Sequence, residues 1–207
     1  MNPSLVVFGD RTANEVLEAA ILGYHDKFGC IEKVYFEEPT FSQVHLPKYT
    51  STANGVFFNV GISNVQAKRQ VIDRCIGIGW KPFTVVHPTA YVSPSCRLGN
   101  GVFVGPLGIL SSNSTVGDHS IVHLHSSIGH DARIGEYCSI LPGARISGNA
   151  IVGDRVLVGS NAFVNAGIRI GHDCQVDALT YVSRDLPEGY LLSTRAKRPM
   201  RRIPGQG

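Results

Sequence analysis

The chain has 207 residues, a formal net charge of +3 at pH 7 and 43% hydrophobic residues. This length suffices for one or two domains with a sizeable core, and the charge is too small to indicate nucleic-acid binding. No stretch resembles a signal peptide or a membrane span, so we expect a cytoplasmic protein that binds neither nucleic acid nor membranes. The five cysteines have no CxxC spacing, which argues against a disulfide framework or a zinc finger.

Residues 1–85 alternate between apolar strands and amphipathic helices. Strands are expected at Leu5–Phe8, Val34–Phe36, Val56–Val60 and Phe83–Val86. Helical spacing of apolar residues predicts a helix at Ala13–Tyr24, with Thr12 or Asn14 as N-cap, and a second helix that follows the turn Gly61-Ile62-Ser63-Asn64 and runs to about Ile76. This order predicts an α/β domain at 1–85 with a parallel, Rossmann-like sheet.

Parallel sheets of this kind bind ligands at the carboxyl ends of their strands. The candidate crevice therefore consists of the residues that follow the predicted strands: Gly9, Asp10, Glu37, Glu38, Gly61, Ser63 and Asn64. The turn at Gly9 lacks the G-x-G-x-x-G spacing, which argues against a dinucleotide as the ligand.

From residue 87 to residue 184 the dominant feature is an aliphatic residue at every sixth position. A period of six fits neither a helix nor a strand and indicates a repeat architecture, the parallel β-helix. Three hexads make one triangular coil, so residues 18 positions apart stack, and about five coils are expected. The aliphatic residues predicted to point inward are Val92, Leu98, Val104, Leu110, Val116, Val122, Ile128, Ile134, Ile140, Ile146, Val152, Val158, Val164, Ile170, Val176 and Val182.

Small residues stand two places before these aliphatic positions, among them Cys96, Cys138 and Cys174. We expect these three cysteines to pack inside the coils and not to act as nucleophiles. The chain then leaves the coils through Asp185–Gly189 and ends in a basic tail, so the second domain is expected at 86–207.

Three histidines, His123, His125 and His130, fall in one predicted coil. His130 stands two places after the inward Ile128, so its side chain should point outward at a corner beside Asp131, and we expect His123 and His125 on the same corner. An outward imidazole beside a carboxylate can act as a general base. The alternative is that His130 is only a solvated turn residue.

The chain resembles the hexapeptide-repeat sugar acyltransferases of the NeuD/PglD-like group over nearly its whole length. The resemblance is carried by the α/β unit, the joint Val86-His87-Pro88-Thr89-Ala90, the run from Ile128 through Pro142-Gly143 to Gly148, and the closing Val182–Pro187. It implies a left-handed β-helix, a homotrimer, acetyl-CoA in the groove between prisms, no metal, and N-acetylation of a nucleotide-linked amino sugar. The winding rests on the resemblance, because other parallel crossovers are nearly always right-handed.

The resemblance also implies roles for individual residues. His130 would be the base, Asp131 its modulating carboxylate, and the N–H near Gly148 a donor to the oxyanion. The residues implied for cofactor binding are Gly148, Ala166, Ala178, Lys197 and Arg198, the last two as candidate partners of the CoA phosphates. His123 and Ser139 join the crevice residues as candidate substrate-binding residues.

The sequence departs from the family pattern at positions near the substrate. The glycine-rich first turn is here Gly9-Asp10-Arg11-Thr12, the acidic pair is Glu37 and Glu38, and Ser139 stands where the family often has a histidine. We expect the altered first turn to shift which nucleotide is preferred.

Three other interpretations use the same scaffold. Sugar O-acetylation, as in the sialic-acid branch, needs the same base. A γ-type carbonic anhydrase could take His125 and His130 from adjacent subunits as zinc ligands, but a third ligand is lacking near Thr89. A non-catalytic scaffold would leave His130 and Asp131 without a role.

Overall fold

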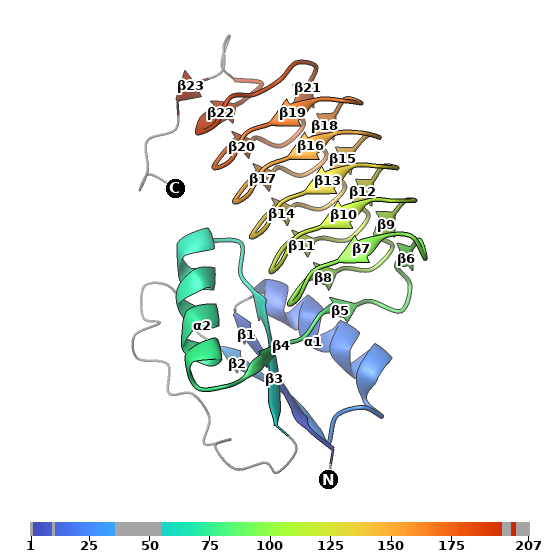
Figure 1. The fold of residues 1–207 in the computed structure, drawn as a ribbon, viewed down its shortest axis with the longest axis vertical. Helices are drawn as coiled ribbons and strands as arrows, with labels where there is room; N and C mark the ends of the chain where they lie inside the picture. The colour runs from blue at the N-terminus through green and yellow to red at the C-terminus, as the bar shows by residue number, and fades with distance from the viewer. Residues whose placement is uncertain (1, 10, 36–54, 196–199, 202–207) are drawn as a thin grey trace.

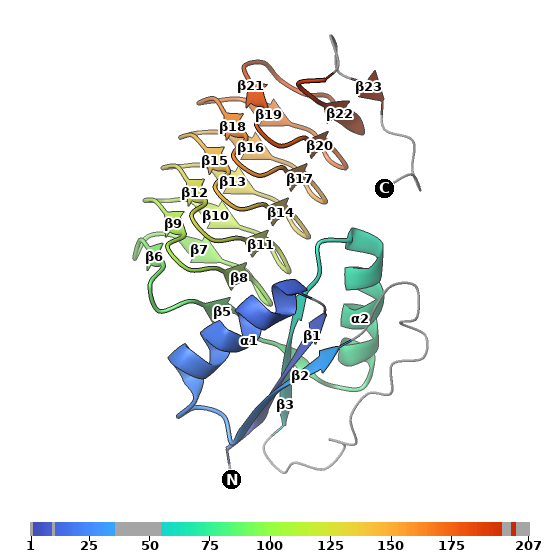
Figure 2. The same ribbon diagram turned by 180° about the vertical axis from the view of Figure 1, so that it is seen from behind.

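The computed structural model describes residues 2–9, 11–35, 55–195 and 200–201, and it joins an α/β unit to a triangular prism of short strands (Figures 1 and 2). The fold class predicted from the sequence, an α/β unit followed by a parallel β-helix, is confirmed. Five of the predicted site residues lie outside the described residues: Asp10, Glu37, Glu38, Lys197 and Arg198.

The α/β unit is built on a parallel sheet with the strand order β2-β1-β3-β4. Its strands are β1 (Ser4–Gly9), β2 (Cys30–Tyr35), β3 (Val56–Gly61) and β4 (Lys81–Pro82). The prediction of the fourth strand at Phe83–Val86 is wrong, because Val85–Val86 forms β5, which pairs with β8 of the prism. Because apolar residues stand on both sides of Phe83, the sequence pattern did not show where the sheet of the α/β unit ends and the prism begins.

The two helices cover opposite faces of this sheet. Helix α1 (Arg11–Tyr24) packs with Leu5 and Val7, whereas α2 (Val65–Gly77) packs with Val6 and Phe8. Alternate residues of β1 point to opposite faces, so both of its faces are apolar. The predicted N-caps of α1 are wrong, since the helix begins at Arg11, before Thr12 and Asn14. Neither described helix has the length and apolarity needed to cross a membrane.

The prism consists of stacked coils, and each coil contributes one strand to each of three sheets. We call the first sheet the head face: β5 (Val85–Val86), β8 (Phe103–Val104), β11 (Ile121–Val122), β14 (Ser139–Ile140), β17 (Leu157–Val158), β20 (Gln175–Val176), β22 (Tyr190–Leu192) and β23 (Met200–Arg201). We call the second the apolar face: β6 (Tyr91–Val92), β9 (Ile109–Leu110), β12 (Ser127–Ile128), β15 (Arg145–Ile146), β18 (Phe163–Val164) and β21 (Tyr181–Val182). We call the third the arginine face: β7 (Arg97–Leu98), β10 (Thr115–Val116), β13 (Arg133–Ile134), β16 (Ile151–Val152) and β19 (Arg169–Ile170).

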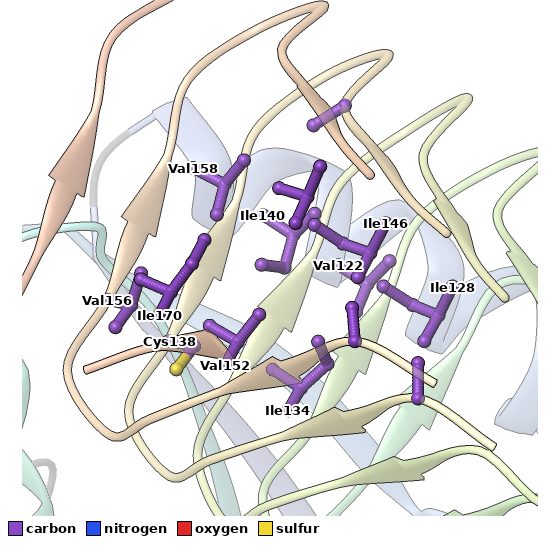
Figure 3. Packing of buried hydrophobic residues seen from close by; sticks show 14 of the residues in the cluster. Val122, Ile128, Ile134, Cys138, Ile140, Ile146, Val152, Val156, Val158 and Ile170 are labelled. Carbon is purple, nitrogen blue, oxygen red and sulfur yellow. The ribbon is translucent and has the colours of Figure 1, made fainter. Parts of the chain in front are cut away.

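The aliphatic residues of the hexads fill the interior of the prism, as predicted. Each is the second residue of its strand, and Val122 pairs in parallel register with Val104 and Ile140, 18 residues away on either side. Figure 3 shows how Ile140, Ile146 and Ile134 converge from the three faces. Cys138 and Cys174 lie in this core and Cys96 packs against it, so the packing prediction for the cysteines is confirmed.

The coils continue beyond the predicted limits of 87 and 184. Val86 is a further inward residue six positions before Val92, and β22 adds a strand that pairs with β20. The period of six therefore begins one hexad earlier than the sequence indicated.

The α/β unit is fixed to the first coils by both apolar and polar contacts. Phe103 and Ile121 on the head face share a buried cluster with α1. The Asn59 side chain donates hydrogen bonds to the backbone carbonyls of Phe83, Gly101 and Val102 at 2.8–3.3 Å. The fully buried Lys68 donates to the carbonyl of His119 at 3.1 Å. These contacts hold the sheet's carboxyl edge beside the head face.

Candidate active site

His130 lies at the corner between β12 and β13, where the apolar and arginine faces meet; we call this the His130 corner. Its side chain is 62% exposed, and its Nδ1 lies 2.9 Å from Oδ2 of Asp131. An ionised carboxylate can only accept a hydrogen bond, so Nδ1 carries the proton and Nε2 keeps a free lone pair. The predicted outward position beside Asp131 is confirmed, and the tautomer suits a general base.

Asp131 is held in place by the neighbouring coil. Its backbone is in the left-handed region, with φ of 58°, and its N–H donates to the carbonyl of Ser112 at 2.9 Å. Asn113, 18 residues earlier, donates from Nδ2 to Oδ1 at 3.2 Å. The hydrogen bond from His130, followed by that from Asn113, lowers the pKa of the Asp131 carboxyl. Asn113 was not among the site residues predicted from the sequence, although its spacing of one coil from Asp131 was a signal for it.

Gly148 lies one coil above His130 and faces its ring. A Cβ at position 148 would lie 2.5 Å from Nε2 of His130, so only glycine leaves room for the imidazole. The Gly148 N–H donates no hydrogen bond to any of the described residues. The lone pair of Nε2 and a free backbone donor therefore stand next to each other, an arrangement suited to a general base and an oxyanion donor.

The predicted cofactor residues do not all share this corner. Ala166 stands one further coil along it, where its N–H donates to Oδ1 of Asn165 at 2.9 Å. Ala178 instead lies on the corner between the head and apolar faces, which also carries His125. Within one chain, His130, Gly148 and Ala166 therefore share a corner of the prism, and Ala178 lies on a different one.

At the predicted crevice of the α/β unit, the backbones of β1, β3 and α1 approach one another closely. Gly9 and Gly61 pair at the ends of β1 and β3, and a Cβ on Gly61 would lie 2.8 Å from the backbone of Ala13 in α1. These glycines therefore let the first turn of α1 approach the sheet edge. Asn64 caps α2, with its side-chain oxygen accepting from the Ala67 N–H at 3.1 Å, and Ser63 is half-buried beside it.

His123 and Ser139 are buried at the head face, and His123 lies against α1. His123 is 6% exposed in its side chain, and its Nδ1 lies 3.6 Å from Oε2 of Glu15 in α1. The expectation that His123 and His125 share the corner of His130 is wrong, because strand β12 separates them from it. Glu15 was likewise not predicted from the sequence; its only signal was a carboxylate beside the buried residue Val16 of α1.

The crevice and His130 therefore lie on opposite sides of one prism. The crevice adjoins the head face, whereas the His130 corner is the junction of the other two faces. The prism therefore separates a ligand bound in the crevice from Nε2 of His130 in the same chain.

No group of three or more His, Cys, Asp and Glu side chains within the described part of the chain is arranged to hold a metal ion. Within one chain His125 and His130 occupy different corners and do not converge. Burial raises the pKa of the Cys138 thiol to about 11, which removes it as a nucleophile near neutral pH.

Residues 131–166 match the family model described as bacterial transferase hexapeptide (six repeats), and residues 149–184 match the hexapeptide repeat of succinyl-transferase. Over 61 residues the chain is 30% identical to GDP-perosamine N-acetyltransferase from Escherichia coli O157:H7. That stretch covers 30% of this chain and 28% of the curated relative.

The fold is similar to solved structures over almost the whole chain. One is the acetyltransferase domain of PglB from Neisseria gonorrhoeae FA1090 in complex with acetyl coenzyme A, with a TM-score of 0.82, 24% identity, and coverage of 97% of this chain and all of that one. Another is PerB from Caulobacter crescentus in complex with CoA and GDP-perosamine, with a TM-score of 0.81, 24% identity, and coverage of 97% and 98%. The fold expected from the resemblance is thereby confirmed for both the α/β unit and the prism.

Proposed function

We propose that the chain is an acetyl-CoA-dependent N-acetyltransferase that acts on a nucleotide-linked amino sugar, with His130 as the general base. The observation that carries this proposal is the arrangement of Nε2 of His130 beside Gly148, with Nδ1 bound to Asp131. The similarity in fold to structures that contain acetyl coenzyme A or CoA together with GDP-perosamine supports the choice of both substrates.

The chemistry follows from the positions of these groups. The neutral amine of the sugar attacks the thioester carbonyl carbon while Nε2 of His130 accepts one amine proton, and the ionised Asp131 stabilises the resulting imidazolium. The Gly148 N–H donates a hydrogen bond to the oxyanion. When the C–S bond breaks, the electron pair leaves with sulfur, and the imidazolium returns the proton to give free CoA thiol and the N-acetyl sugar.

The placement of the cofactor is part of the same proposal. Acetyl-CoA would lie along the His130 corner, with its thioester at Gly148 and its chain passing Ala166. Ala178 stands on a different corner, so it would contact the cofactor from a neighbouring subunit. Lys197 and Arg198 remain candidate partners of the CoA phosphates.

A homotrimer would bring the separated parts of the site together. The crevice adjoins the head face and His130 lies across the prism, so the nucleotide would bind one subunit and its sugar would reach His130 of a neighbour. The exposed Tyr91, Ile109, Phe163 and Tyr181 on the apolar face supply a surface that a second prism can cover. A substrate bridging two subunits would explain why Gly9, Gly61 and Ser139 lie far from the base.

We also propose that the enzyme acts in the cytoplasm, where acetyl-CoA is available as substrate. All five cysteines are free in the structure, which agrees with a reducing compartment.

The proposal is tested with acetyl-CoA and a panel of UDP-, GDP- and dTDP-linked amino sugars, with free thiol as the readout and the product identified by mass and NMR. We expect one nucleotide-linked amino sugar to be acetylated on nitrogen, with a higher kcat/KM than the free sugar. Acetylation on oxygen would instead favour the sialic-acid type of transferase. Release of thiol with none of the acceptors above the rate of hydrolysis would contradict the proposal.

A further inference from the structure

Two polar side chains meet between α1 and the head face, and a third is buried one coil further along that face. Glu15 comes from α1, His123 follows β11, and Ser139 begins β14 on the next coil. Ser139 is 1% exposed and pairs in register with Ile121, two residues before His123. Glu15 stands two residues after Ala13, whose backbone closely approaches Gly61 of the crevice.

The buried polar atoms of this cluster have no hydrogen-bond partner among the described residues. They are Oε2 of Glu15, both ring nitrogens of His123 and Oγ of Ser139, four of the five such side-chain atoms in that part of the chain. The 3.6 Å between Nδ1 of His123 and Oε2 of Glu15 is longer than a hydrogen bond. Buried polar groups are almost always satisfied in native proteins, so such a concentration calls for a ligand or a function.

The chemistry of the cluster selects the ligand. The Glu15 carboxylate accepts hydrogen bonds and repels anions, which disfavours a phosphate. The Ser139 hydroxyl can both donate and accept, and the His123 ring offers a donor on one nitrogen and an acceptor on the other. A sugar hydroxyl, which donates one hydrogen bond and accepts others, matches these three groups.

We infer that Glu15 is a specificity-determining residue that binds a hydroxyl group of the acceptor sugar, together with His123 and Ser139. This inference rests on the proposed function, since it takes an amino sugar as the ligand. The nucleotide is held at the Gly9–Gly61 edge, the sugar extends past Glu15 along the head face, and its amine reaches His130 of the adjacent subunit. Glu15 orients the acceptor and exchanges no proton with the reacting amine.

The test compares wild type with Glu15→Gln, which keeps the size of the side chain and removes its charge. The probes are the nucleotide-linked amino sugar that wild type acetylates and its monodeoxy analogues, one for each free hydroxyl of the sugar. For one analogue we expect wild-type kcat/KM to fall by roughly tenfold to a hundredfold, as for loss of a hydrogen bond to a charged group. In Glu15→Gln that penalty should shrink below about threefold, with the KM for acetyl-CoA unchanged.

Glu18→Gln is the matched control, because Glu18 is an exposed carboxylate on the same helix. It should keep the full wild-type penalty. The melting temperature of Glu15→Gln should not fall, since the buried Oε2 of Glu15 has no hydrogen bond to lose among the described residues. If Glu15→Gln does not fold, Ser139→Ala replaces it: the penalty in kcat/KM for the same deoxy analogue should again shrink relative to wild type.

The outcomes separate this inference from the function it rests on. Turnover by all variants with the same penalty for every deoxy analogue would overturn the role of Glu15 and leave the acetyltransferase intact. Absence of turnover by wild type with every nucleotide-linked amino sugar would contradict the proposed function itself.

Discussion

Two atoms at the His130 corner carry the proposed chemistry, and each is available because of what stands one coil away. Nε2 of His130 has its free lone pair because Asp131 takes the proton of Nδ1, and Asn113 of the preceding coil holds Asp131. The ring has its position because Gly148 of the following coil has no side chain. Residues 18 positions apart lie next to each other in adjacent coils, and this stacking gives the proposed site its geometry.

Replacement of His130 by alanine should lower kcat by roughly a hundredfold or more, because the imidazole acts in the transition state. The KM for acetyl-CoA should change little. Asp131→Asn should cost less, since the base itself remains. Steady-state kinetics check this, with His172→Ala as the control: His172 is another exposed corner histidine, beside Asp154. Wild-type turnover by His130→Ala would show that the base lies elsewhere.

Gly148→Ala should lower kcat by roughly a hundredfold while the chain stays folded. The added Cβ would stand 2.5 Å from Nε2 of His130 and force the ring out of line with the oxyanion donor. The measurement is kcat alongside the melting temperature. Ser112→Ala, on the same corner one coil before His130, should leave kcat near the wild-type value. An unaltered kcat in Gly148→Ala would place the reaction away from this corner.

At the scale of the element, each corner of the prism depends on residues in the left-handed backbone region. Asn, Asp and Gly occupy many of these positions, for example Asn113, Asp131 and Gly167, with φ of 57°, 58° and 72°. Their short side chains tolerate this conformation better than most. The polar residues of the hexads are therefore part of the turn and not only its solvated surface.

Gly167 isolates the backbone contribution of such a corner. A Cβ at this position meets nothing within 4 Å, so Gly167→Ala should destabilise the fold only through backbone strain, by about 1 kcal/mol. Gly167→Asn should be closer to neutral, because asparagine tolerates the left-handed region. Urea unfolding of the three proteins measures the difference. Equal stability of the alanine and glycine forms would mean that the corner relaxes.

At the scale of the whole molecule, the joint between the α/β unit and the prism contains a buried amine. Burial lowers the pKa of Lys68 from 10.5 to about 7, with a smaller opposing effect of Cys138. His119, whose carbonyl accepts the hydrogen bond from Lys68, has its pKa lowered to about 4 by burial. In the folded protein, Lys68 therefore changes charge near neutral pH.

Stability should rise as the pH increases from about 7 towards 10.5. In that window the unfolded chain binds a proton at Lys68 that the folded chain does not, so the slope of unfolding free energy against pH is positive. Below about pH 7 both forms are protonated and the cost, on the order of a few kcal/mol, is constant. Urea unfolding at pH 6.5, 7.5 and 8.5 checks this. Lys68→Met should lose that part of the slope, and an identical slope would contradict a lowered pKa.

Mixed assembly tests whether the site is shared between subunits. His130→Ala removes the base, and Ser63→Trp should block the crevice of the α/β unit, so each variant alone should have low activity. Co-expression of the two should restore a measurable fraction of turnover, because some interfaces join an intact crevice to an intact His130. Purification through two different tags isolates the mixed oligomers. Mixed oligomers as inactive as either parent would indicate that each chain contains a complete site.

The sequence by itself determined the prism and the outward position of His130, the proposed base. Contacts in the coils run from each residue to the one 18 positions away, so the inward aliphatic residues, the packed cysteines and the outward His130 follow from a local period. The predicted start of the repeat was wrong because Val86, its first inward residue, lies in an apolar segment that also resembles an ordinary strand.

Only the tertiary structure decided what α1 covers and which residues meet across the prism. The burial of His123 and Ser139, and the contact of His123 with Glu15, depend on docking between segments more than 100 residues apart. The six-residue repeat does not predict this docking, because it depends on the packing of Phe103 and Ile121 against α1. The separation of the crevice from His130 likewise follows from the three-sided closure of the coil, which assigns neighbouring hexads to different faces.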